Sequence, residues 1–171
     1  MLARFTALLA PLAVAVALLA VPLPASAAST WPVPSSVDTA KDVAAMSMSE
    51  FETHVMVEIN QARADQGLRR ISVFDRCTDR LAERWGRRIA VTDRFEHRNQ
   101  KQVIRKCRAS WAGETLVRGT GLTPERMVEL WLDSPGHRAI LLSPRARRAG
   151  VDVRRDASGR MIGVVNLVRH R

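Results

Sequence analysis

The stretch whose residue types best suit a catalytic or metal-binding site is Trp131-Leu132-Asp133-Ser134-Pro135-Gly136-His137-Arg138. Pro135 disfavours helical geometry at the residue before it, and Gly136 lets the backbone reverse, so we expect a helix to end here in a tight turn. The turn would hold His137 firmly and leave it open to solvent, which suits a metal ligand or a general base. The alternative is that His137 only caps the last carbonyls of the helix, and this stretch alone does not separate the two.

The first 27 residues are predicted to be a secretory signal peptide. Arg4 precedes the apolar run 7–21, and Ala25-Ser26-Ala27 has the A-x-A form of a cleavage site, so cleavage near Ala27/Ala28 would make the protein extracellular. The alternative is an uncleaved membrane anchor, since residues 5–23 are nearly long enough to span a bilayer. Pro11 and the cleavage-like site favour export, and we expect no integral membrane protein after cleavage.

The two cysteines, Cys77 and Cys107, are expected to form one disulfide. Export would bring them into an oxidising compartment, where an isolated pair in a small domain usually forms a disulfide. A thiolate zinc site needs further ligands at C-x₂₋₄-C spacing, and the chain has none. The link would stabilise the fold by roughly 3 to 4 kcal/mol in the chain-entropy model.

The charge balance points to anionic partners. The chain has 27 basic and 17 acidic residues, a net charge of +10, and the region from Arg98 to Arg118 holds six basic residues against one acid. For an exported protein we expect anionic cell-envelope polymers or lipid headgroups rather than nucleic acid. A solvated basic surface without a partner is the alternative. We expect a monomer.

The segment 28–47 is interpreted as a Pro/Ser-containing linker, because it shows no apolar period long enough to build an element. The domain proper would be 48–171. Its first helix is predicted to start at Ser49, whose hydroxyl and the Glu52 carboxylate form a capping box, and to end near Gly67. His54 lies on a different face from the apolar residues and is interpreted as a surface residue.

The remaining elements follow from periodicity and turn chemistry. A helix over 75–91 can be capped by Asp75, and its apolar stripe of Cys77, Leu81, Trp85 and Ile89 is interpreted as core. A polar loop then reaches about Gly113, and Thr123-Pro124-Glu125 starts a third helix. The alternating residues 150–154 and the nearly apolar run 161–168 predict a terminal hairpin, with the second strand covered on both faces by helices.

In this order the chain resembles a bacterial member of the CAP superfamily, also called the SCP domain. The resemblance rests on Asn60-x-x-Arg63 with Gly67-Leu68, Phe95-x-His97, Gly113-Glu114, Trp131-x-x-Ser134-Pro135-Gly136-His137-Arg138 and Gly150-Val151. It covers about 51–168. It implies an α+β fold, an α-β-α sandwich with a small antiparallel sheet between helices.

The resemblance also implies a cleft that contains His97, Glu114 and His137, which in some members holds a divalent metal. This chain has Ser134 where many eukaryotic members have a second cleft glutamate, and Thr115 follows Gly113-Glu114 in place of asparagine. The lost carboxylate should weaken a divalent ion electrostatically. Two imidazoles and one carboxylate still form the minimal ligand set of a catalytic zinc site.

Three functions are compatible with these residues. The favoured one is a secreted protein that binds an extracellular or cell-envelope ligand, with a cleft able to hold a divalent metal such as Zn²⁺. The second is a metal-assisted hydrolase of peptide, glycan or ester bonds, with His97, Glu114 and His137 as candidate catalytic residues. The third is a lipid- or sterol-binding protein, as in some CAP members. The alternative to all three is that the trio is only a buried polar network.

Overall fold

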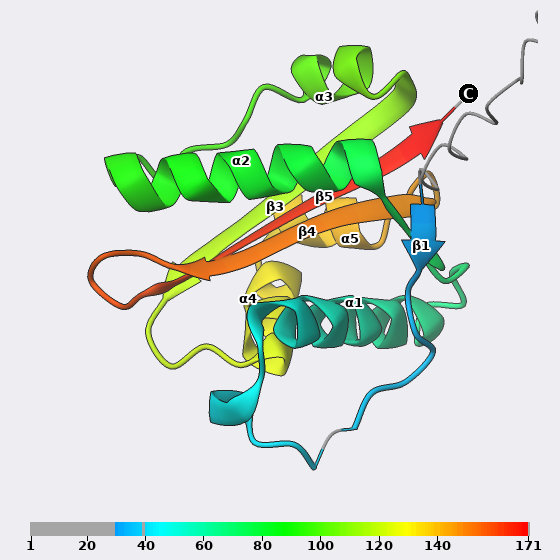
Figure 1. Cartoon of the computed structure of the whole chain (residues 1–171). Coiled ribbons are helices and arrows are strands. Elements are labelled where there is room, and N and C mark those ends of the chain that lie inside the picture. Colours follow the sequence, from blue (N-terminus) through cyan, green and yellow to red (C-terminus); the bar gives the residue numbers. More distant parts are fainter. Residues whose placement is uncertain (1–29, 39, 171) are drawn as a thin grey trace, which may run out of the picture.

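The computed structural model describes residues 30–38 and 40–170 and has three layers (Figure 1). A five-stranded sheet lies between α2 and α3 on one face and α1, α4 and α5 on the other. The predicted α-β-α sandwich is confirmed. The predicted signal peptide lies outside the described residues, and within them no helix is both long and apolar enough to cross a bilayer.

The helices are α1 (Met48–Ala64), α2 (Arg76–Thr92), α3 (Gln100–Lys106), α4 (Pro124–Asp133), α5 (Pro135–Leu141) and the 3₁₀ turn η1 (Val43–Ala45). The strands are β1 (Thr30–Pro32), β2 (Val73–Asp75), β3 (Ala109–Gly119), β4 (Arg148–Arg155) and β5 (Met161–His170).

The order of strands leaves β3 at one edge of the sheet. The order is β1-β2-β4-β5-β3, with β5 antiparallel to both β4 and β3. The sheet is not wholly antiparallel, because β2 pairs with β4 in parallel at Phe74 and Ala149. The edge position of β3 matters for function, since one side of this strand is free to border a cleft.

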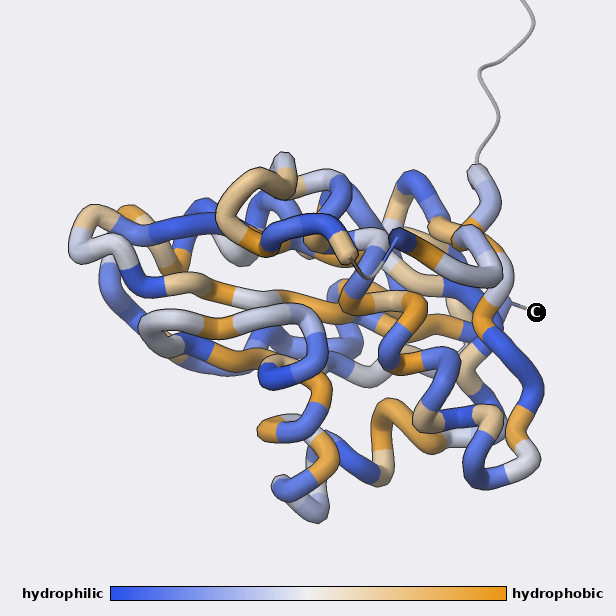
Figure 2. Tube along the Cα trace, turned by 90° about the horizontal axis from the view of Figure 1, so that it is seen from below, coloured by the Kyte–Doolittle hydropathy of each residue, from blue (hydrophilic) through white to orange (hydrophobic). Residues whose placement is uncertain are grey.

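Strand β5, which lies between β4 and β3, is buried on both faces, as its apolar sequence predicts. Val165 and Leu167 belong to the core beneath α1 and α4, whereas Ile162 and Val164 pack with α2 residues on the other face. Figure 2 shows orange, hydrophobic stretches along the strands that cross the middle of the molecule. The alternation follows from the period of two of an extended chain.

The prediction that 28–47 is a linker without secondary structure is wrong for part of that segment. Thr30–Pro32 pairs with β2, the Trp31 ring stacks on Phe74 with centroids 5.4 Å apart, and the Val33 side chain is buried. Proline is tolerated there because β1 is an edge strand. The Pro-rich composition concealed a strand held by distant contacts.

The start of α1 differs from the prediction by two residues. Ser47 is the N-cap and forms the capping box with Glu50, while the Glu52 carboxylate accepts a hydrogen bond from the backbone N–H of Val153 in β4, at 2.9 Å. His54 is buried, so its interpretation as a surface residue is wrong. It lines a hollow with Val37, on the side of α1 that the N-terminal segment covers.

Two predicted loops are helical or extended. The loop expected from Arg98 to about Gly113 contains α3 and the first residues of β3. The turn expected at Ser134–His137 is the junction between two helices: Pro135 occupies the first position of α5, where its missing N–H costs nothing. His137 therefore lies in the first turn of a helix and does not cap the end of α4.

Candidate metal and ligand cleft

The sequence-predicted site residues line one cavity of about 390 Å³ beside the free edge of β3. His97 comes from the connection between α2 and α3, Glu114 from β3, and His137 from α5. The cavity is also lined by Arg98, Gln100, Trp111, Gly113, Ser134 and Ile140. The α2–α3 connection on one face of the sheet and α5 on the other thus place the two histidines around the same strand edge.

The Glu114 carboxylate orients the His97 ring through its Nδ1 atom. Oε1 of Glu114 lies 3.0 Å from Nδ1 of His97 and accepts a hydrogen bond from the backbone N–H of Arg98 at 2.8 Å. A carboxylate at Nδ1 favours the tautomer with the proton on that nitrogen, which leaves Nε2 with a free lone pair. Burial raises the pKa of Glu114, and these two hydrogen bonds oppose that shift.

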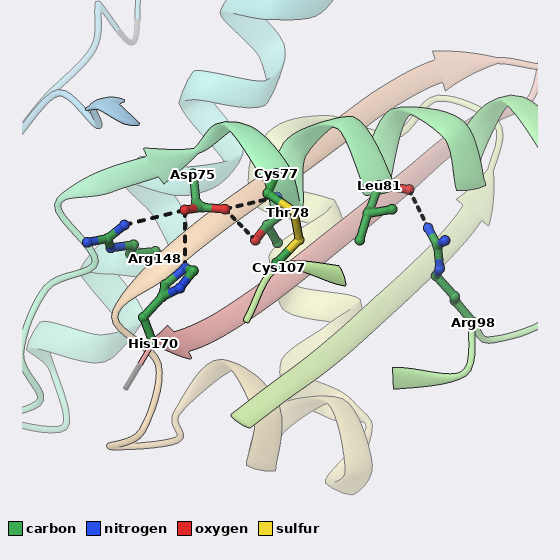
Figure 3. The surroundings of a disulfide bond; sticks show 8 residues. All are labelled: Asp75, Cys77, Thr78, Leu81, Arg98, Cys107, Arg148 and His170. Carbon is green, nitrogen blue, oxygen red and sulfur yellow. Dashed lines mark hydrogen bonds and ion pairs between the residues drawn. A yellow bond between two sulfur atoms is a disulfide. The ribbon is translucent and has the colours of Figure 1, made fainter. Parts of the chain in front are cut away.

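The segment that carries His97 is attached to α2. The Trp85 indole N–H donates to the carbonyl of Glu96 at 3.0 Å, and the Arg98 guanidinium donates to the carbonyl of Leu81 at 3.0 Å. Figure 3 shows the second contact. Trp85, predicted to be a core residue, thus also holds the backbone next to His97 through its indole.

Close packing of α5 on β3 brings His137 to the edge. A Cβ on Gly113 would lie 2.8 Å from Cγ2 of Ile140 in α5, so only glycine permits this approach. Nε2 of His137 lies 3.3 Å from Nε2 of His97. Burial, followed by the charge of His97, lowers the pKa of His137 and so favours its neutral imidazole.

The two Nε2 atoms have the spacing of metal ligands. Two nitrogens bound to one tetrahedral Zn²⁺ at 2.0 to 2.1 Å are about 3.3 Å apart. Glu114 contacts the opposite side of the His97 ring, so as placed it orients a ligand rather than reaching the space between the rings. The pair of histidines fits a divalent ion, with Glu114 as the hydrogen-bond partner of one of them.

Within the described residues, the one group of three ligand atoms within 4.8 Å of each other belongs to Asp75, Cys77 and Cys107. These cysteines are joined by a disulfide, which confirms the predicted pairing and removes their thiolates as ligands. The bond ties the start of α2 to the residue that ends α3 (Figure 3). It therefore supports the helices on either side of His97.

Asn166 is a site neighbour that the sequence analysis missed. It lies directly across the β3–β5 ladder from Glu114 and is fully buried. Among the described residues neither amide atom of Asn166, nor Oε2 of Glu114, has a hydrogen-bond partner. The signal was present in the sequence, because Asn166 is the single polar residue in the run 161–168.

A comparison with protein-family profiles shows to which family this chain belongs. The profile of the Cysteine-rich secretory protein family, CAP, matches residues 57–167, which include all three site residues. The chain belongs to the CAP family. The resemblance drawn from the sequence motifs is confirmed.

This CAP protein is similar to a bacterial relative. The uncharacterized protein YkwD of Bacillus subtilis is 27% identical over 131 residues, which are 72% of this chain and 50% of YkwD. This chain therefore spans half the length of that relative.

Solved structures share the fold. An outer surface protein of Borrelia burgdorferi matches with a TM-score of 0.66 and 20% identity, covering 74% of this chain and 97% of the other. An extracellular SCP-domain protein of Bacillus anthracis matches with a TM-score of 0.59 and 17% identity, covering 72% and 44%.

Proposed function

We propose that this CAP protein is exported, binds a ligand of the cell envelope or its surroundings, and holds a divalent metal such as Zn²⁺ between His97 and His137. The observation that carries the metal proposal is the 3.3 Å separation of the two Nε2 atoms beside an open cavity. Both nitrogens converge on one volume, and the Glu114 carboxylate sets the tautomer of His97. The tautomer that this carboxylate favours leaves the lone pair of His97 Nε2 directed at His137 and the cavity.

Export is supported by three independent features. The N-terminal sequence has the layout of a secretory signal, the disulfide suits an oxidising compartment, and the matched Bacillus anthracis structure is described as extracellular. The net charge of +10 favours anionic envelope polymers or lipid headgroups as the partner.

Hydrolysis is the second candidate function. It is favoured by the series of side-chain contacts from Glu114 to His97 and from His97 to His137. A carboxylate that orients one imidazole, which in turn contacts another, is an arrangement that can move a proton. A bound zinc would supply a polarised water at this position. Ser134 lines the same cavity, but within the described residues it forms no side-chain hydrogen bond with either histidine, so the geometry nominates no activated serine nucleophile.

Titration calorimetry with Zn²⁺ tests the metal proposal. We expect binding of micromolar affinity or weaker at pH 7.5, with proton release, and weaker binding as the pH falls and protonates the imidazoles. The His97→Ala, His137→Ala double variant should lose this heat. The His170→Gln variant removes a histidine outside the cleft and should keep it. Equal heats for the wild type and the double variant would contradict a metal site in the cleft.

A further inference from the structure

Beyond the histidine cleft, two more hollows follow the first residues of β3. The nearer one, about 230 Å³, is lined by Ser110, Trp111, Arg145, Arg169 and His170, and the farther one, about 540 Å³, by Ile104, Arg105, Arg108, Ala109 and His170. The cleft and the nearer hollow share Trp111, and the two hollows share His170. We call this series of three the β3 groove.

The groove is long enough for an extended ligand. The residues that border it run from Arg108 at its far end to Glu114 in the cleft. Six steps of an extended strand cover about 20 Å. A ligand that fills the groove is therefore a linear chain of several units rather than a single small ion.

Four exposed arginines at the groove lack acidic partners. Within the described part of the chain no carboxylate lies within 4.0 Å of the guanidinium of Arg105, Arg108, Arg145 or Arg169. Asp75, the acid behind the groove, is already engaged by Thr78, Arg148 and His170 (Figure 3). The positive charge here is available to a ligand.

Trp111 and His170 line the walls of the groove. Nε2 of His170 lies 3.2 Å from Oδ2 of Asp75, a contact that becomes an ion pair when the ring is protonated. Trp111 is partly buried against the main core, so its indole has few alternative positions. A fixed indole offers a flat apolar surface with a polar edge, which suits the apolar face of a sugar ring.

From these features we infer that the β3 groove binds a linear anionic polysaccharide, with Trp111 against a sugar ring and Arg145 and Arg169 on the carboxylate or phosphate groups of the chain. Planar guanidinium groups bind both kinds of anion through paired hydrogen bonds. This inference rests on the proposed binding of an envelope ligand, and it names the class of that ligand and its place. It does not depend on the metal.

The test uses a galacturonate oligomer of six units as the carboxylate probe and a neutral glucose oligomer of the same length as its control. Binding to the full mature protein is measured by calorimetry at low salt with EDTA, which keeps metal out of the readout. We expect the anionic oligomer to bind, the neutral one to bind far more weakly, and the affinity to fall as salt rises. A poly(glycerol phosphate) oligomer then distinguishes phosphate from carboxylate as the preferred anion.

The decisive variants alter charge at exposed positions and leave the core intact. Arg145→Gln with Arg169→Gln should weaken binding by at least about tenfold, because two charged hydrogen-bonding groups are lost. The matched control, Arg69→Gln with Arg94→Gln, removes the same charge from exposed arginines outside the groove and should change affinity little. Trp111→Leu, checked for unaltered circular dichroism, should weaken the sugar oligomer more than inorganic polyphosphate.

Three results would overturn the inference: equal losses in the groove and control variants, equal binding of neutral and anionic oligomers, or tighter binding of single-stranded DNA with the same dependence on Arg145 and Arg169. Zinc binding by the same preparation separates the two proposals. A protein that binds zinc at its histidines but no anionic saccharide would refute the groove and leave the metal cleft standing.

Discussion

Titratable side chains form one group beside β3 and another beside β4. The two groups differ in what their polar atoms contact. Beside β4, Oδ1 of Asp79 accepts the backbone N–H of Val151 at 3.1 Å, and Oε1 of Glu52 accepts that of Val153 at 2.9 Å. Asp152 forms an ion pair with Arg154. These carboxyl groups complete the edge of a strand that β2 pairs only at its start.

Within the described residues, the rings of the two histidines beside β3 contact side chains and form no hydrogen bond with a strand backbone. Their Nε2 atoms face each other next to a cavity, and the sequence around them makes the approach possible through Gly113 and Pro135. Yet the larger pKa shifts lie at the other group, where burial and neighbouring acids raise the pKa of Glu52 to about 8 and that of Asp79 to about 6. A shifted pKa alone therefore does not mark a functional site; convergence of several polar side chains on a cavity is the better criterion.

Two glycines give the sharpest contrast in stability. A Cβ on Gly150, in β4, would lie 2.2 Å from the backbone nitrogen of Asp79, whereas one on Gly136, in α5, would meet nothing within 4 Å. Gly150→Ala should destabilise the protein by about 3 kcal/mol or more, because backbone cannot move aside as a flexible side chain can. Gly136→Ala should be neutral or stabilising by up to about 1 kcal/mol. Urea denaturation measures both, and equal losses would contradict the packing described for β4.

Glu114→Gln tests the role of the carboxylate behind His97. Its amide oxygen can still accept a hydrogen bond, but the negative charge that favours a metal-bound imidazole is lost, so zinc affinity should fall about tenfold to a hundredfold. The control is Glu96→Gln, an exposed neighbour paired with Arg88, which should bind zinc as the wild type does. Unchanged zinc affinity in Glu114→Gln would remove Glu114 from the site.

Glu52→Gln tests the group beside β4 through the pH dependence of protein stability. The raised pKa of Glu52 means that the folded protein binds a proton more tightly than the unfolded chain, so this group lowers stability progressively between its unfolded value near 4.5 and about pH 8. The neutral variant avoids that loss and should be about 1 kcal/mol more stable than the wild type at pH 8, with little difference at pH 5. Denaturation midpoints across this range provide the measurement. A variant less stable at pH 8 would show that the charged carboxylate is favoured at β4.

Local sequence patterns predicted much of the fold. The stripe with Leu81 and Ile89 and the cap at Asp75 located α2, Thr123 located α4, and the alternation around Val151 located β4. Each of these signals is contained within one element. The resemblance to the CAP family implied His97, Glu114 and His137 as site residues, and the structure brings them into one cavity.

The wrong predictions concern segments whose secondary structure or burial is determined by contacts with residues distant in the sequence. Ser47-x-x-Glu50 and Ser49-x-x-Glu52 are equally good capping boxes by sequence, and the helix starts at the first, with Glu52 engaged by β4, about one hundred residues away. The polar residues of β3 predicted a loop, and pairing with β5 makes them a strand. His54 is buried by a segment whose composition indicated no structure. None of these partners can be predicted from the neighbouring residues in the sequence alone.

Zinc anomalous diffraction from crystals soaked in Zn²⁺ tests the central claim most directly. We predict one strong peak between Nε2 of His97 and Nε2 of His137, with the Glu114 carboxylate still on Nδ1 of His97. A peak elsewhere, or histidine side chains turned away from each other with no ion between them, would contradict the account.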